Sequence, residues 1–163
     1  MNIILVTGGS GKTGRRVAAQ LDKMGVARRV ASRSACGSGT VTFDWNSPET
    51  YDAALESVSA VYLVAPPGAV DPLPSMQMFL ERALEVGVEK FVLLSASSIE
   101  EDGPMMGEVH GWLRRNAPSW VVLRPTWFMQ NFSEQQHLPT IIANDAIYSA
   151  TGNGKVGFIN ADD

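Results

Sequence analysis

The chain has 163 residues, of which 45% are hydrophobic, and a net charge of −4. This length suits one domain with a substantial core, spanning residues 1–163. The acidic balance offers no basic surface, so we expect a small-molecule substrate and neither nucleic acid nor a membrane as partner. Cys36 is the only cysteine; it cannot form an internal disulfide, and it fits a cytoplasmic location. The apolar run at the N-terminus is too short for a signal peptide.

Short runs rich in valine, isoleucine and leucine alternate with longer segments of helical periodicity. This alternation is typical of repeated β-α units. The predicted strands are Ile3 to Thr7, Arg29 to Ser32, Val41 to Asp44, Val61 to Ala65, Phe91 to Ser95 and Val121 to Arg124. Because each run is apolar throughout, helices are expected over both faces of every strand. The predicted fold class is α/β, a Rossmann-type doubly wound parallel sheet with ligands at the carboxyl ends of its strands.

Helical spacing of apolar side chains marks the segments between the strands. The predicted helices are Lys12 to Met24, the segment that follows Ser47-Pro48, Pro72 to Val86, and Met105 to Asn116. Gly25 and Gly87 stand where left-handed helix caps are expected. The regular pattern ends at Arg124, so residues 1–124 are expected to form the Rossmann core and residues 125–163 the start of a substrate-side region. There, Gln130 to Ala143 is a candidate helix, and Ile147 to Ile159 is expected to form short strands around a turn.

Three glycines follow the first strand at the mouth of the first helix. One permits a tight turn, one lets the backbone approach a pyrophosphate, and one lets the helix pack against the strand. The unpaired N–H groups of the helix N-terminus then face the anion. The expected cofactor contacts of this turn are Gly8, Ser10, Gly11, Lys12, Thr13 and Gly14.

A P-loop is the rival interpretation of the same segment, because Gly11-Lys12-Thr13 reproduces the end of that motif. The motif also requires a glycine where this chain has Val6, inside the predicted strand. A dinucleotide turn is therefore favoured over a nucleoside triphosphate site.

The end of the second predicted strand bears on which dinucleotide is bound. An NAD-binding domain places an acidic side chain about 20 residues beyond the glycine turn, to accept hydrogen bonds from the adenosine ribose. This chain has Ser32 and Arg33 there instead, and both suit a ribose 2′-phosphate. NADP(H) is thus expected to be preferred over NAD(H). The alternative is that Arg33 only solvates the end of a strand.

Further motifs carry a family resemblance: Phe43-Asp44-Trp45, the segment Val61 to Pro67, and Leu123 to Asn131. With the glycine turn, they make the chain resemble the NmrA-like atypical short-chain dehydrogenases, and most of all bacterial relatives of the ergot-alkaloid enzyme festuclavine dehydrogenase. The resemblance implies several contacts with the cofactor. They are Asp44 and Trp45 at the adenine, Ala65, Pro66 and Pro67 over the ribose and pyrophosphate, Ser95 and Ala96 at the nicotinamide ribose, and Pro125 beside the nicotinamide.

Each of these contacts has a structural alternative. Asp44 can cap a turn, Pro66-Pro67 can end a strand, and Trp127 can belong to the core. The Tyr-x-x-x-Lys pair of typical short-chain dehydrogenases is absent, and its two slots hold Met106 and His110. Met106 cannot transfer a proton, and a single histidine on a helix is more often structural. No catalytic residue is assigned, and no metal site is expected.

Two functions are compatible with these features. One is an NADP(H)-dependent reductase of a small organic molecule, such as an imine, enone or quinone. The other is a non-catalytic NADP(H)-binding redox sensor or regulatory protein. The resemblance also implies a further C-terminal region over the substrate, without which apolar surface is exposed and a homodimer could form. Candidates for that exposed wall, or else for the core, are Met105, Met106, Trp112, Trp127 and Met129.

Overall fold

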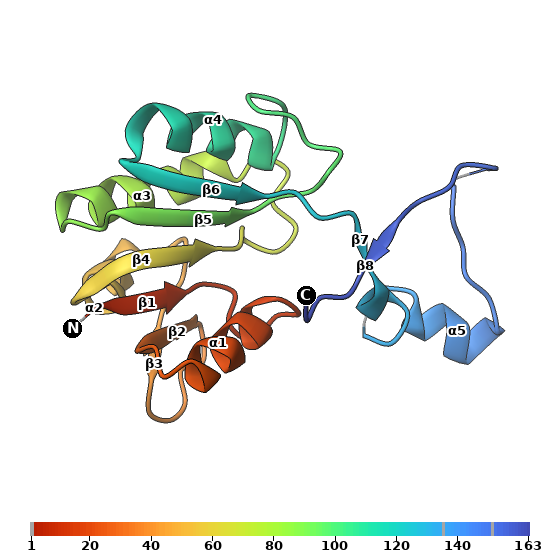
Figure 1. The fold of residues 1–163 in the computed structure, drawn as a ribbon, viewed down its shortest axis with the longest axis horizontal. Coiled ribbons are helices and arrows are strands. Elements are labelled where there is room, and N and C mark those ends of the chain that lie inside the picture. The colour runs from red at the N-terminus through yellow and green to blue at the C-terminus, as the bar shows by residue number, and fades with distance from the viewer. Residues whose placement is uncertain (1, 135, 151) are drawn as a thin grey trace. The chain divides into compact units, whose positions relative to one another are not determined.

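The computed structural model describes residues 2–134, 136–150 and 152–163 (Figure 1). The chain divides into two compact units, Met1–Arg124 and Pro125–Asp163. We call them the sheet unit and the C-terminal unit and describe each by itself. No helix of the described residues is long and apolar enough to cross a membrane.

The sheet unit contains one sheet of six strands, all paired in parallel, in the order β3-β2-β1-β4-β5-β6. The strands are β1 (Ile3–Val6), β2 (Arg28–Ser32), β3 (Thr40–Thr42), β4 (Val58–Leu63), β5 (Lys90–Leu94) and β6 (Ser119–Leu123). The predicted α/β fold with a parallel sheet is therefore confirmed, with strand ends shifted by a few residues. From β1 the chain first adds strands on one side and then, from β4 onward, on the other. The crevice between β1 and β4 is thus the topological switch point.

Helices cover the two faces of this sheet unequally (Figure 1). They are α1 (Gly14–Lys23), α2 (Tyr51–Leu55) after a 3₁₀ turn at Pro48–Thr50, α3 (Leu73–Glu85) and α4 (Met106–Asn116). Helix α1 packs on β1 and β2. On the opposite face, α3 contacts both α2 and α4. Right-handed crossovers between parallel strands require this division, because the chain moves away from β1 in opposite directions.

The helix ends follow the glycine pattern. Gly25, with φ of 67°, and Gly87, with φ of 90°, take the expected left-handed conformation just after α1 and α3. Ser47 stands at the N-cap position of the 3₁₀ turn, but its side chain makes no capping hydrogen bond. The hydroxyl of Thr50 instead donates to the Ser47 carbonyl at 2.7 Å.

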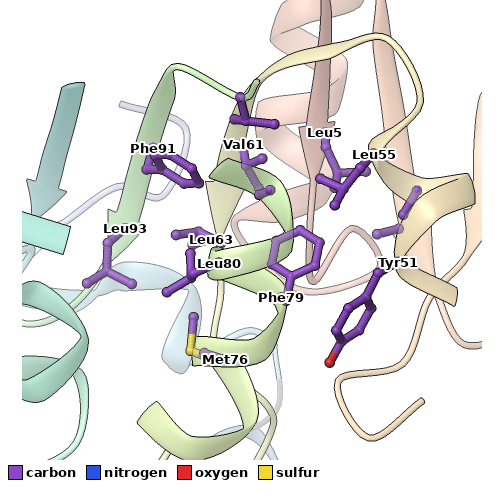
Figure 2. Packing of buried hydrophobic residues seen from close by; sticks show 14 of the residues in the cluster. Leu5, Tyr51, Leu55, Val61, Leu63, Met76, Phe79, Leu80, Phe91 and Leu93 are labelled. Atoms are coloured by element: carbon purple, nitrogen blue, oxygen red, sulfur yellow. The ribbon is translucent and has the colours of Figure 1, made fainter. Parts of the chain in front are cut away.

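The hydrophobic core lies between the sheet and helices α2, α3 and α4 (Figure 2). Phe79 of α3 is fully buried and points into the centre of this cluster. Around it are Leu5, Val61, Leu63, Phe91 and Leu93 from the strands, Met76 and Leu80 from α3, and Tyr51 and Leu55 from α2. The buried strand residues come from central strands, which explains their nearly continuous apolar sequences.

The edge strand β6 departs from the prediction. Val121 is 51% exposed and Leu123 is 42% exposed, on one face of the strand. The helix on that face of the sheet is α1, and it contacts β1 and β2 rather than β6. The expectation that helices cover both faces of every strand is therefore wrong at β6.

The C-terminal unit is built around two short strands, β7 (Trp127–Phe128) and β8 (Phe158–Ile159), which pair in parallel. Of the strands expected around a turn in Ile147 to Ile159, the described residues of this segment form only β8, which pairs with the distant β7. The Gln130 side chain holds the segment that follows β8: it donates to Asn160 Oδ1 at 2.5 Å and accepts from the Ala161 N–H at 2.9 Å.

The single helix expected from Gln130 to Ala143 is also corrected. A 3₁₀ turn at Met129–Asn131 is followed by α5 (Leu138–Asn144), which carries Pro139 in its first turn. Proline lacks the N–H that a continuing helix would need, but it is tolerated where a helix begins. Gln135 and Thr151, which fall inside the two predicted segments, lie outside the described residues.

Candidate cofactor site

The glycine turn joins the end of β1 to the start of α1. Gly8 has φ of 60°, and the N–H of Gly11 donates to the Gly8 carbonyl at 2.9 Å. A Cβ on Gly14 would lie 2.3 Å from that carbonyl oxygen, and one on Gly8 would lie 2.9 Å from the Cβ of Val64. A side chain is thus excluded at Gly14 by the backbone of the turn and at Gly8 by the Val64 side chain, as a pyrophosphate-binding turn requires.

Thr7 ties this turn to the neighbouring strand across the switch point. Its buried hydroxyl donates to the Tyr62 carbonyl at 3.0 Å and accepts from the Val64 N–H at 2.8 Å. Burial raises the pKa of the Tyr62 phenol, and a hydrogen bond with the Thr13 side chain partly offsets that rise. The turn is therefore held from β4 as well as from its own ends.

A cavity of about 600 Å³ opens beside the glycine turn at the carboxyl ends of the strands. Its lining residues come from four separate segments of the sheet unit. They are Gly8, Ser10, Gly11, Ala31, Ser32, Arg33, Ser34, Phe43, Asp44, Trp45, Asn46, Val64, Ala65, Pro66 and Pro67. This volume and mixed lining suit a nucleotide-sized ligand.

Most of the residues predicted as cofactor contacts meet in this cavity, but some do not line it. Lys12 and Thr13 belong to the glycine turn, and Gly14 is the first residue of α1. Ser95 follows β5, where its N–H donates to the Leu123 carbonyl at 2.8 Å, and Ala96 is next to it. Pro125 is the first residue of the C-terminal unit.

Five lining residues were not predicted: Ala31, Ser34, Phe43, Asn46 and Val64. Each is a chain neighbour of a predicted contact, so proximity in sequence is the signal that could have identified them. Phe43 and Val64 belong to the motifs that carry the family resemblance, but the resemblance assigned the contacts to their neighbours.

Arg33 lies just beyond β2 on the wall of the cavity. Within the described residues, its guanidinium has no hydrogen bond or ion pair. The neighbouring Ser32 hydroxyl accepts the N–H of Ser34 at 3.2 Å. A cation with no internal carboxylate partner keeps its charge available to an anionic ligand.

Asp44 has a local role as well as a place in the cavity. Its carboxylate accepts the Asn46 N–H at 2.9 Å, and its carbonyl accepts the Ser47 N–H at 3.0 Å. These two bonds form the turn that carries Trp45. The turn-capping alternative for Asp44 is therefore observed, and the residue lines the cavity at the same time.

The two slots of the missing Tyr-x-x-x-Lys pair are occupied by side chains with other contacts. Met106 is only 6% exposed and belongs to the core. The ring of His110 packs 5.3 Å from that of Trp120, and its Nε2 lies 3.9 Å from Glu101 Oε2. Among the described residues, no group of three histidine, cysteine or acidic side chains could hold a metal ion.

The apolar residues considered for an exposed wall separate into two groups. Met106 and Trp112 are buried in the core. Met105, Trp127 and Met129 are exposed. Only the second group remains a candidate for contact with a substrate or partner.

A parallel sheet with a glycine turn at its switch point, and a cavity at the carboxyl ends of its strands, defines a Rossmann-type dinucleotide-binding protein. The model of the family described as NAD(P)H-binding matches residues 8–151. The chain belongs to this NAD(P)H-binding family, which confirms the resemblance inferred from its motifs.

Several relatives match nearly all of this chain. It is 44% identical to the uncharacterized oxidoreductase YesF of Bacillus subtilis, over 99% of this chain and 57% of that protein. It is 43% identical to agroclavine dehydrogenase of Claviceps fusiformis, over 98% of this chain and 59% of that protein. Festuclavine synthase II of Penicillium roqueforti is 41% identical, over 98% and 60% of the two chains. The chain thus spans less than two thirds of the length of these relatives.

Solved structures share the fold at low sequence identity. A nucleoside-diphosphate-sugar epimerase from Staphylococcus aureus has a TM-score of 0.78 at 16% identity, covering 99% of this chain and 63% of that one. A short-chain dehydrogenase/reductase superfamily protein from Agrobacterium tumefaciens, with bound NAD, has a TM-score of 0.64 at 22% identity, covering 78% and 50%. These similarities establish the Rossmann-like fold.

Proposed function

We propose that this chain is the cofactor-binding part of an NADP(H)-dependent oxidoreductase that acts on a small organic molecule. The carrying observation is that the glycine turn and Arg33 face the same cavity. The turn suits the pyrophosphate, because α1 begins there and its unpaired N–H groups favour an anion. Bound NADPH would supply the hydride.

The preference for NADP(H) rests on the charges at the end of β2. A 2′-phosphate carries negative charge and strong acceptor oxygens, which a guanidinium binds through charge-assisted hydrogen bonds. Arg33 is the basic side chain among the cavity residues, and Ser32 and Ser34 flank it with hydroxyl groups. An NAD-selective site would instead carry a carboxylate here.

Replacement of Arg33 by alanine is expected to weaken NADPH binding by about 10- to 150-fold, which corresponds to the loss of one charge-assisted contact. NADH binding should scarcely change, because NADH has no 2′-phosphate. Fluorescence titration with both cofactors measures the two affinities. Lys23→Ala removes the same charge outside the cavity and serves as the control. An unaltered ratio of NADPH to NADH affinity in Arg33→Ala would overturn the NADP(H) assignment.

The proposed class of hydride acceptor rests on the absence of the Tyr-x-x-x-Lys pair from its two slots, which hold Met106 and His110. Hydride delivery to an iminium or activated alkene needs little or no acid from the protein at the reacting atom, so cofactor placement can supply most of the catalysis. The names of the agroclavine and festuclavine relatives support a small organic substrate. We propose imines, enones and quinones as the acceptors to screen.

A redox sensor that binds NADP(H) without turnover is the second candidate. Buried Met106 and His110 favour it, because Met106 cannot transfer a proton and the His110 ring is engaged by Trp120 and Glu101. Consumption of NADPH with any of the screened acceptors would exclude the sensor. Tight NADPH binding without turnover across the screen would favour it over the reductase.

The C-terminal unit would form the beginning of the substrate side in this proposal. Its helix α5 has no buried residue, and Trp127, Met129 and Phe158 are exposed. Exposed apolar side chains of this kind favour a further covering partner. A homodimer would provide one, and sedimentation would give its molar mass.

A further inference from the structure

The segment that carries Asp44 and Trp45 is irregular, although both residues line the cavity. It runs from the end of β3 at Thr42 to the 3₁₀ turn at Pro48–Thr50. A segment without strand pairing needs other contacts to hold one conformation. Those contacts come from Thr50, Tyr51 and Phe79, which do not line the cavity, and from Phe43, which does.

Tyr51, the first residue of α2, is buried and makes one of these contacts. Its side chain is 3% exposed, and its hydroxyl donates to the Trp45 carbonyl at 2.8 Å. Burial is the main cause that raises the pKa of this phenol, and the charges of Asp44 and Glu49 add to it. The hydroxyl therefore remains a donor across the neutral range.

Ring contacts fix the Trp45 side chain at the same point. Its indole meets the ring of Phe43 edge-on at 4.8 Å and that of Phe79 at 5.3 Å. The Tyr51 ring also meets Phe79 edge-on, at 5.3 Å. Edge-to-face pairs at these separations are the favoured geometry of aromatic rings. Main chain and side chain of Trp45 are thus both held by the core.

A second tie holds the preceding residue. The Thr50 hydroxyl accepts the Asp44 N–H at 3.2 Å while donating to the Ser47 carbonyl at 2.7 Å. Neither Thr50 nor Tyr51 lines the cavity. They can act on a ligand only through the lining residues that they contact, which are Asp44, Trp45 and, for the Tyr51 ring, Phe43.

We infer that Tyr51 is a positioning residue for cofactor binding: its hydrogen bond to the Trp45 carbonyl holds the adenosine-facing wall of the cavity in its binding conformation. This inference rests on the proposed NADP(H) function. The physical basis is pre-organisation, because a wall already ordered in the free protein loses less conformational entropy when the ligand binds. The hydroxyl group, rather than the ring, carries this role, since the ring packs within the core in either case.

Tyr51→Phe tests the inference, because it removes the hydroxyl and keeps the ring. We expect about 2- to 12-fold weaker binding of 2′,5′-ADP and of NADPH, the range of one neutral hydrogen bond. NADH should weaken by the same factor, in contrast to Arg33→Ala, since the adenosine is common to both cofactors. Reduced nicotinamide mononucleotide, which lacks the adenosine, should bind as it does to the wild type. Calorimetric titration gives all four affinities.

Tyr148→Phe is the matched control, because it removes a phenol hydroxyl from an exposed residue of the C-terminal unit. Wild-type affinity for 2′,5′-ADP in Tyr51→Phe would overturn the inference. A lowered melting temperature with equal losses for 2′,5′-ADP and for the mononucleotide would also overturn it, since that pattern marks a merely structural role. If the wild-type protein bound neither NADPH nor 2′,5′-ADP, the proposed function itself would fail.

Discussion

Replacement of Gly14 by alanine is expected to weaken NADP(H) binding by more than about tenfold while the sheet still forms. The new Cβ would lie 2.3 Å from the Gly8 carbonyl oxygen and 2.9 Å from the Gly9 Cα. Both contacts are with backbone, so the turn must move away from α1. Forcing atoms into a packed site typically costs about 1–3 kcal/mol. Because the moved backbone is the proposed pyrophosphate site, the loss should appear directly in the NADPH affinity.

Gly25→Ala separates this effect from a general loss of stability. Gly25 follows the same helix at its other end, with φ of 67° and open space around the position of a Cβ. An alanine there carries the cost of the left-handed backbone, about 1–2 kcal/mol, without touching the cavity. Titration with NADPH should show wild-type affinity for Gly25→Ala. If Gly14→Ala bound NADPH equally well, the assignment of this turn to the pyrophosphate would be wrong.

Phe79→Ala is expected to cause the largest loss of stability, about 3–5 kcal/mol in the free energy of unfolding. Phe79 is fully buried and meets the rings of Phe43, Trp45 and Tyr51. Its removal leaves a cavity that these neighbours can fill only by moving. Urea unfolding followed by circular dichroism measures the change.

Met78→Ala provides the comparison for this prediction, because Met78 is the preceding residue of α3 and is 53% exposed. Its free energy of unfolding should stay within about 0.5 kcal/mol of the wild-type value. Similar losses in the two variants would show that the packing at Phe79 is not specific. The Trp45 ring packs against that of Phe79. NADPH binding should therefore also weaken in Phe79→Ala, even at temperatures where the variant is folded.

The parallel sheet and its glycine turn could be predicted from sequence because their signals are local. Apolar runs such as that of β1 identify buried strands. Three glycines at intervals of three residues, directly after such a strand and before a helix, indicate a dinucleotide-binding turn. The same holds for Gly25 and Gly87, whose left-handed conformation follows from their position after a helix.

What could not be predicted depends on contacts between distant segments. Val121 and Leu123 belong to an apolar run like any other, and only the position of β6 at the sheet edge leaves them exposed. Met105 is the N-cap residue before α4, with φ of 60°, and is 43% exposed, whereas Met106 is the first residue of the helix and is 6% exposed. The residue at which the helix begins, and so the side chain that faces the core, is not fixed by the apolar pattern alone.

The C-terminal unit shows the same limit. Phe158 and Ile159 pair with Trp127 and Phe128, about thirty residues earlier in the chain. Short apolar segments separated by glycines contain no local indication of such a partner. The Gln130 side chain, which holds the returning chain at Asn160, also looks in the sequence like any polar residue in a helix.

The bonds of Thr7 to Tyr62 and Val64 link residues that lie 55 and 57 positions apart. During synthesis from the N-terminus, the first β-α-β segment therefore leaves the ribosome long before its phosphate turn has support on the β4 side. A nucleotide bound at the proposed site would therefore stabilise this segment only after Val64 has been made and β4 has inserted beside β1. We expect its contribution to come late in folding, on a sheet that is already half assembled.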